Sequence, residues 1–353
     1  MNLDKWGWNR YFKEKFALNV YEGIVPGRII KESKHIYQVV TETGSYKGQV
    51  SGHFMYTAVN SSDYPTVGDW VAVEIKDDTA VINKLIERRS SFSRKQAGIE
   101  ASEQIIAANV DMIFLVFSLE GGRNYSSGAV ERFLTRAWDS GATPVIILNK
   151  SDLCSDSEDF VYQTEALAPG VYIHLTSTVT GEGIEELKNY IRPGMTLMFT
   201  GFSGVGKSTL INALYGEELM RTGGIRESDQ KGKHTTTHKE LLLMKNGGLL
   251  IDTPGLKELQ LWGSEDSLGD SFEDIRSISE DCRFTDCSHS GEPGCAVQQA
   301  LADGELDYRR YQNYLDMKKE LKYLDSKVSA KANLDKKAKG KQLAKYIKQI
   351  KKR

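Results

Sequence analysis

The chain has 353 residues, enough for two or three domains, and its 40% hydrophobic and 27% charged residues are ordinary for a soluble globular protein. No apolar run reaches the roughly 18 residues that a membrane span needs. The N-terminus mixes charges with aromatic residues, so it lacks the apolar core of a signal peptide. We therefore expect a cytoplasmic protein with no membrane partner.

The net charge of −2 hides an asymmetry along the chain. Residues 326–353 hold eleven Lys or Arg and one acid, Asp335, a net of +10, so residues 1–325 carry −12. A basic tail on an acidic body indicates an anionic partner that the protein contacts through this tail. A solvated, disordered tail fits the composition equally well.

Residues 1–95 predict an aromatic N-terminal segment followed by a small β-barrel. The aromatic residues expected to pack on the body of the protein are Trp6, Trp8, Tyr11, Phe12 and Phe16. Residues 21–90 then contain four or five short alternating stretches broken by Gly, Asn and Asp, a pattern typical of strands. Such a set suits an OB-fold, with an SH3-like barrel as the alternative. These barrels often bind nucleic acid, but the fold alone does not establish it.

Residues 96–262 predict an α/β domain of the doubly wound type. Apolar runs alternate with helical stretches, and they lie at residues 111–119, 143–149, 170–177, 195–201 and 247–255. Continuous apolar runs predict strands that are buried on both faces of a parallel sheet. Residues 263–325 then carry a Cys/His cluster and a helical run, which predicts a small metal-binding domain before the basic tail.

The first motif in chain order is Asn149-Lys150-Ser151-Asp152, at the end of the predicted strand 143–149. A carboxylate at position 152 can accept hydrogen bonds from N1–H and the 2-amino group of guanine, a donor pair that adenine lacks. Asn149 can bond the acceptor side of the base, and the stem of Lys150 can cover the ring. Ser177, after the next predicted strand, fits the small loop that closes on guanine.

The strongest single motif is G-x-x-x-x-G-K-S, which follows one predicted strand and precedes a predicted helix. Its glycines let backbone N–H groups curl around phosphates, the lysine reaches the β- and γ-phosphates, and the serine hydroxyl ligates Mg²⁺. The predicted phosphate-binding residues are Gly201, Phe202, Ser203, Gly204, Val205, Gly206, Lys207, Ser208 and Thr209. Together with the N-K-S-D motif, this loop specifies GTP and GDP over adenine nucleotides.

Two further segments predict a γ-phosphate-dependent switch. Asp252 ends a hydrophobic strand and can hold Mg²⁺, and the N–H of Gly255 can face the γ-phosphate. Among three adjacent threonines we favour Thr236 as the residue that completes the Mg²⁺ shell. Residue 256 is leucine, where Ras-like proteins carry a water-orienting glutamine. His234 is the nearest candidate for that role, and the alternative is a solvated loop histidine.

The order of these motifs is circularly permuted. Ordinary GTPases run from phosphate loop to switch threonine, D-x-x-G, N-K-x-D and closing loop, whereas here the last two come first. Such a permutation is tolerated when the original termini lie close together.

Three of the four cysteines crowd beside one histidine. The ligand set Cys282, Cys287, His289 and Cys295 predicts a closed, tetrahedral and structural zinc site. Cys154 stands alone and receives no role.

The N-K-S-D motif before GFSGVGKST, the KGKHTTTH segment, DTPG and the C-x₄-C-x-H-x₅-C cluster together resemble the bacterial ribosome small subunit-dependent GTPase A family over nearly the whole chain. The resemblance implies an OB-like barrel, a permuted GTPase domain and a zinc-binding domain. It also implies a GTPase that binds the 30S subunit late in maturation, is stimulated by it and contacts 16S rRNA, and that His234 assists hydrolysis. The role of the Lys-rich tail stays open.

Two other functions remain open at this point. One is an RNA-binding module that uses GTP as a structural ligand, and the other is a signalling GTPase with protein partners. We expect a monomer that holds one zinc ion and binds Mg²⁺ with GTP.

Overall fold

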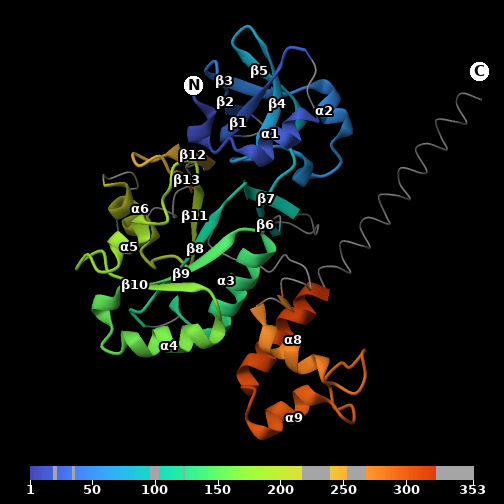
Figure 1. Cartoon of the computed structure of the whole chain (residues 1–353), viewed down its shortest axis with the longest axis vertical. Coiled ribbons are helices and arrows are strands. Elements are labelled where there is room, and N and C mark those ends of the chain that lie inside the picture. Colours follow the sequence, from blue (N-terminus) through green and yellow to red (C-terminus); the bar gives the residue numbers. More distant parts are fainter. Residues whose placement is uncertain are drawn as a thin grey trace, which may run out of the picture. The chain divides into compact units, whose positions relative to one another are not determined.

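The computed structural model describes residues 1–18, 22–33, 36–95, 103–121, 124–216, 239–252, 268–269 and 271–322 (Figure 1). The chain divides into two compact units, one of residues 1–93 with 105–259 and the other of residues 94–104 with 260–353. Among the described residues, no helix has the length and apolar character to cross a membrane. The predicted boundaries at 95, 262 and 325 stay predictions.

A closed five-stranded barrel forms the first part of the larger unit. Its strands are β1 (Ile24–Ser33), β2 (Ile36–Val40), β3 (Ser45–Val50), β4 (Trp70–Lys76) and β5 (Thr79–Leu85). They pair in the order β1-β2-β3-β5-β4, and β4 pairs back onto β1. The β3–β5 pair is parallel and the others are antiparallel. Helix α2 (Gly52–Thr57) and the 3₁₀ turn η2 (Ser61–Asp63) connect β3 to β4. This topology confirms the OB-fold prediction over the SH3-like alternative.

The aromatic N-terminal segment packs on this barrel, as the sequence predicts. It folds into the 3₁₀ turn η1 (Leu3–Trp6) and helix α1 (Arg10–Ala17). The rings of Trp8 and Phe12 lie 4.5 and 5.7 Å, centroid to centroid, from the fully buried ring of Trp70. Large aromatic surfaces are thereby removed from water at one side of the barrel.

A mostly parallel sheet forms the second part of the larger unit. Its order is β10-β9-β8-β11-β13-β12, and all pairs except β12–β13 are parallel. Its strands are β8 (Met112–Ser118), β9 (Thr143–Asn149), β10 (Tyr172–Thr176), β11 (Thr196–Thr200), β12 (Lys239–Leu243) and β13 (Leu249–Asp252). Every residue of β8 and β11 is buried, which confirms that the apolar runs are central strands.

Helices cover both faces of the sheet (Figure 1). Alternate residues of β8 belong to different cores: Ile113 and Leu115 pack with helix α3, whereas Phe114 and Val116 pack with helix α6. The covering helices are α3 (Ser127–Asp139), α4 (Ser157–Leu167), α5 (Ile184–Lys188) and α6 (Lys207–Tyr215), and η4 (Ser151–Leu153) is a 3₁₀ turn after β9. This is a doubly wound α/β domain, which places the loops at the carboxyl ends of the strands at one edge.

Strand β12 joins the sheet to the barrel. It pairs with β13 on one side and with β1 on the other, where Glu32 lies opposite Lys239. The fully buried Arg28 of β1 donates to Oγ1 of Thr196 at 2.8 Å and to the carbonyl of Gly68 at 3.3 Å. Barrel and sheet therefore share both a hydrogen-bonded ladder and a buried polar contact. Strands β6 (Ser91–Lys95) and β7 (Glu103–Ala108) pair separately.

The smaller unit is helical where the structure describes it. It contains α8 (Glu273–Glu280), α9 (Ala296–Asp303) and helical residues 308–322. Its own core includes Phe272, Ile275, Val297, Tyr311 and Met317.

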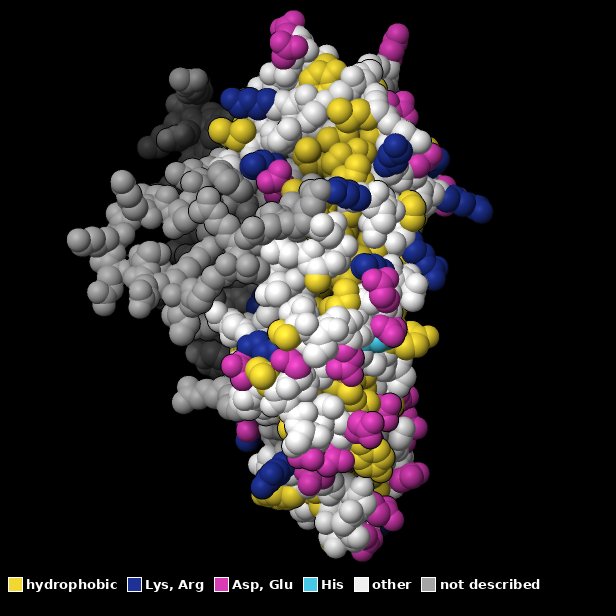
Figure 2. Space-filling model, turned by 90° about the vertical axis from the view of Figure 1, so that its left-hand side faces the viewer, with side chains coloured by type: hydrophobic (Ala, Val, Ile, Leu, Met, Phe, Trp, Pro, Cys, Tyr) yellow, Lys and Arg dark blue, Asp and Glu magenta, His cyan; other side chains and the backbone are white. Residues whose placement is uncertain are grey.

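Acidic side chains are prominent on the surface. Figure 2 shows Asp and Glu side chains gathered toward the lower end of the face that it presents. In helix α4, Glu158 and Asp159 are exposed in the first turn, where negative charge also complements the helix dipole. These two acids therefore contribute to the stability of helix α4 as well as to surface charge.

Candidate nucleotide site and metal centre

The loop between β11 and α6 has the backbone shape that the G-x-x-x-x-G-K-S motif predicts. Gly201, Gly204 and Gly206 have φ values of +148°, +84° and +97°, which residues with a Cβ rarely adopt. Gly206 is the N-cap of α6, so the loop ends where the N–H groups of that helix point outward. A turn of this shape is suited to holding phosphate groups.

Lys207 begins helix α6 and folds back over the loop. Its ammonium donates to the carbonyls of Gly201 and Phe202 at 2.8 and 2.6 Å. Burial lowers the pKa of Lys207 to about 8, because removal from water disfavours the charged form. Ser208 and Thr209 follow in the first turn of the same helix.

Asn149, at the end of β9, connects the phosphate loop to the next strand of the sheet. Its buried side-chain amide donates to the carbonyl of Val205 at 2.8 Å and accepts from the hydroxyl of Thr176 at 3.0 Å. A Cβ at Gly206 would run into this amide. Asn149 thus links the phosphate loop to β10, and its predicted contact with the base stays a prediction.

Asp152 and Ser177 meet across the ends of β9 and β10. The hydroxyl of Ser177 donates to Oδ1 of Asp152 at 2.5 Å, and it accepts the N–H groups of Val179 and Thr180 at 3.1 and 3.2 Å. A hydroxyl has one proton and two lone pairs, so all of its capacity is used. The carboxylate at position 152 is therefore held in one orientation.

Two acids that the sequence did not single out hold the remaining residues of the N-K-S-D motif. The ammonium of Lys150 pairs with Glu120, two residues after β8. The hydroxyl of Ser151 donates to the carboxylate of Glu182 at 2.6 Å. The two acids follow the carboxyl ends of β8 and β10, the parallel strands on either side of β9, and that position was the one sequence signal for them.

The predicted switch residues lie mostly outside the described residues. Thr236, His234 and Gly255 fall there, and of Asp252 only the backbone is described. That backbone ends β13, where Ile251 lies opposite Met198 of β11. Asp252 therefore lies at the end of the strand that neighbours β11, which leads into the phosphate loop.

The smaller unit brings together the four predicted metal ligands. One donor atom from each of Cys282, Cys287, His289 and Cys295 lies within 4.8 Å of every other. The imidazole Nδ1 of His289 is 3.6 Å from Sγ of Cys282 and 3.5 Å from Sγ of Cys295. Three thiols and one imidazole converging in this way fit a four-coordinate metal site.

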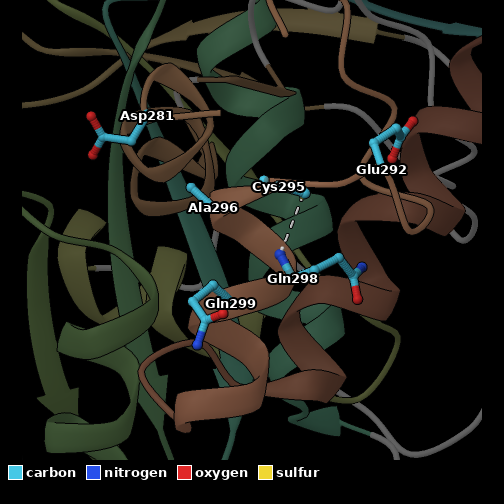
Figure 3. Close-up of a pocket in the computed structure, with 7 residues that line it drawn as sticks. Asp281, Glu292, Cys295, Ala296, Gln298 and Gln299 are labelled. Carbon is cyan, nitrogen blue, oxygen red and sulfur yellow. Dashed lines mark hydrogen bonds between the residues drawn. The ribbon is translucent and has the colours of Figure 1, made fainter. Parts of the chain in front are cut away.

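The cluster is supported by helix α9 and by the backbone of His289. Sγ of Cys295 accepts the N–H of Gln298 at 3.4 Å in the first turn of α9 (Figure 3). Burial raises the pKa of Cys282, but hydrogen bonds from the backbone N–H groups of Val297 and Ala296 and from the thiols of Cys287 and Cys295 together outweigh it, so this pKa lies below its usual value. Such donors favour the thiolate form that binds metals.

His289 has a left-handed backbone, with φ of +60°. Its carbonyl accepts hydrogen bonds from the side-chain amide of Gln298 at 2.6 Å and from the hydroxyl of Tyr311 at 2.8 Å. A non-glycine residue in this conformation is strained, and the two bonds hold it in place.

The loops that follow β9 and β10 meet beside the phosphate loop, although both strands precede that loop in the chain. Fold and site together define a circularly permuted P-loop GTPase. A sequence model of the RsgA GTPase matches residues 85–262. The chain belongs to this family and hydrolyses GTP.

Relatives extend the similarity to nearly the whole length. The chain is 38% identical to the small ribosomal subunit biogenesis GTPase RsgA 1 of Oceanobacillus iheyensis over 352 residues, 98% of either protein. It is 42% identical to the Listeria monocytogenes protein of the same name over 325 residues, which cover 92% of this chain and 90% of that one.

Solved structures agree with the fold. The crystal structure of YjeQ from Thermotoga maritima is 29% identical and gives a TM-score of 0.63, covering 84% of this chain and 98% of that one. YloQ, described as a circularly permuted GTPase, is also 29% identical, with a TM-score of 0.62 and coverage of 85% and 96%.

Proposed function

We propose that this GTPase acts in the late maturation of the 30S ribosomal subunit, is stimulated by that subunit and binds 16S rRNA. The names of its relatives, which cover at least 90% of each chain, support the link to the small subunit. The Lys-rich tail supports a polyanionic partner. The protein works as a monomer in the cytoplasm, where ribosomes mature.

One observation carries the choice of nucleotide: the fixed carboxylate of Asp152 beside the phosphate loop. Asp152 accepts N1–H and the 2-amino group of guanine, and Lys150 covers the ring. Ser177 closes the pocket by orienting that carboxylate. An adenine base leaves the carboxylate without partners, which disfavours ATP.

The phosphates bind at residues 201–209. Backbone N–H groups of the loop face the phosphate oxygens, and the ammonium of Lys207 is drawn from its carbonyl partners toward them. Oxygen donors of Ser208, Thr236 and Asp252 hold Mg²⁺, since this ion prefers such ligands. Bound Mg²⁺ neutralises phosphate charge. The N–H of Gly255 senses the γ-phosphate.

Hydrolysis needs a group that orients the attacking water, and residue 256 is leucine. His234, in the same segment as Thr236, takes that role, and docking on the 30S subunit orders the segment. In the smaller unit, Cys282, Cys287, His289 and Cys295 hold one structural zinc ion, for which their donor set and spacing are suited.

The nucleotide assignment is tested with Asp152→Asn. An amide at this position presents a donor to the 2-amino group, so GDP affinity falls, while xanthosine diphosphate, whose 2-oxo group accepts, binds better. Fluorescence titration with both nucleotides measures the change. If GDP affinity is unchanged in the variant, Asp152 does not bind guanine and the assignment is wrong.

The ribosomal assignment is tested by cosedimentation with 30S, 50S and 70S particles in a GTP analogue and in GDP. We expect retention on 30S particles in the analogue and faster GTP turnover when they are added. His234→Ala should bind 30S particles but lose about 10²–10⁴-fold of the stimulated rate. Equal retention on all three particles contradicts the proposal.

A further inference from the structure

The guanine side of the site consists of the ends of β9 and β10 and the loops that follow them, which hydrogen bonds between side chains connect at three places. Two of the bonds involve residues that the motifs identify: Asn149 with Thr176, and Asp152 with Ser177. The third joins the hydroxyl of Ser151 to Oε2 of Glu182 at 2.6 Å.

The backbone fixes the place from which Glu182 reaches this partner. Its carbonyl accepts the N–H of Ser177 at 3.0 Å, which closes the loop on itself. The next residue, Gly183, has φ of +68°, and a Cβ there would run into the carbonyl of Leu175. Although the side chain of Glu182 is exposed, the backbone that carries it has a tightly defined conformation.

Ser151 is the buried partner of this contact, with an exposed fraction of 7%. It directly precedes Asp152 in the short turn η4 (Ser151–Leu153). Two adjacent residues of the turn are thus held by residues of the loop after β10. Glu182 bonds Ser151, and Ser177 bonds Asp152. Loss of either contact frees one side of the turn that carries the guanine-binding carboxylate.

We propose that Glu182 is a positioning residue for guanine recognition, acting through Ser151 to fix the direction of the Asp152 carboxylate. The proposal rests on the proposed role of Asp152. A charge-assisted hydrogen bond to a buried hydroxyl keeps the pocket in its binding geometry before the nucleotide arrives, so binding loses less free energy to ordering. Glu182 itself takes no part in phosphate chemistry.

The test compares GDP with inosine diphosphate, which lacks the 2-amino group and so loses one of the two bonds to Asp152. In Glu182→Ala, GDP affinity should fall about tenfold, the effect of one charge-assisted hydrogen bond. Inosine diphosphate should lose less, so the preference for GDP shrinks. The turnover number at saturating GTP should stay unchanged.

Three further variants separate positioning from a general loss of structure. Glu182→Gln retains an oxygen that accepts from Ser151, so it should restore most of the preference. Ser151→Ala should add little to Glu182→Ala, because both remove the same bond. The matched control is Glu185→Ala, an exposed acid paired with Lys188 in the adjoining helix, which should keep the wild-type preference.

The outcomes distinguish failure of the positioning role of Glu182 from failure of the guanine-binding role of Asp152. If Glu182→Ala lowers both affinities equally, or if its effect adds fully to that of Ser151→Ala, Glu182 does not position Asp152. If the wild-type protein shows no preference for GDP over inosine diphosphate, the role of Asp152 fails instead. Melting temperatures of the variants show that each is folded at the assay temperature.

Discussion

At the scale of single residues, the hydroxyl of Ser177 orients the carboxylate that we propose binds guanine. Both of its lone pairs accept backbone N–H groups, so its proton can only go to Asp152. The carboxylate is consequently oriented by a group that cannot rotate without breaking two other bonds.

Ser177→Ala should therefore weaken GDP binding about tenfold, since the carboxylate loses its fixed direction and two N–H groups lose an acceptor. Titration with a fluorescent GDP measures the effect. Ser155→Ala is the control, because Ser155 is exposed and bonds only its neighbour Asp156 among the contacts described for its side chain. Equal affinities in wild type and Ser177→Ala would contradict the assignment.

Lys207 gives a prediction about pH. Its pKa of about 8 is lowered by burial, so near pH 8 half of the nucleotide-free protein carries a neutral amine. Phosphates favour the ammonium and raise this pKa, so GDP binding takes up protons, and affinity falls by up to about tenfold per pH unit above pH 8. Calorimetry in buffers of different ionisation enthalpy measures the proton uptake. If GDP binding takes up no protons between about pH 7 and 8.5, the prediction is wrong.

At the scale of elements, the turn from β11 into α6 depends on the lack of a side chain. Gly206→Ala should abolish most GDP binding, because a Cβ would displace Asn149 from its bond to Val205. Gly216→Ala is a matched control: φ is +81°, but nothing lies within 4 Å of a Cβ there. Both variants carry backbone strain of about 1 kcal/mol. If the two variants lose GDP affinity equally, backbone strain and not the contact with Asn149 accounts for the loss.

The elements that the sequence could predict are those specified by local pattern. The continuous apolar runs at 111–119, 143–149 and 195–201 became β8, β9 and β11 because burial on both faces leaves a signal along the chain. The sequence did not predict strand β12, because its five residues are stabilised as a strand by pairing with β1, some 200 residues away in the chain.

The same distinction holds within the site. The spacing of G-x-x-x-x-G-K-S and of N-K-S-D could be read from the sequence because neighbouring residues share one loop. The contacts of Glu120 and Glu182 could not, because they arise where loops from different strands meet. The left-handed backbone of His289 was equally hidden, because two residues of later helices stabilise it.

At the scale of the whole molecule, the metal cluster and the nucleotide site belong to different compact units. Cys287→Ser should therefore release the metal and unfold the smaller unit, while GDP binding survives. Elemental analysis, expected to find about one zinc per wild-type chain, and GDP titration of the variant measure both parts. Cys154→Ser, outside the cluster, should change neither. Loss of GDP binding together with the metal would show that the units depend on each other.

The pairing of β12 with β1 has a consequence for how the protein is made. One edge of β1 is covered by β4 at residues 24–28 and by β12 at Lys31 and Glu32. The ribosome synthesises roughly 5–20 residues per second, so β12 leaves it about 10–40 s after β1. During that interval the barrel can already close through β4 and β1, but Lys31 and Glu32 still lack their partners in β12. This part of the barrel's edge is therefore completed only after most of the GTPase sheet has been synthesised, although the barrel itself is complete in sequence long before.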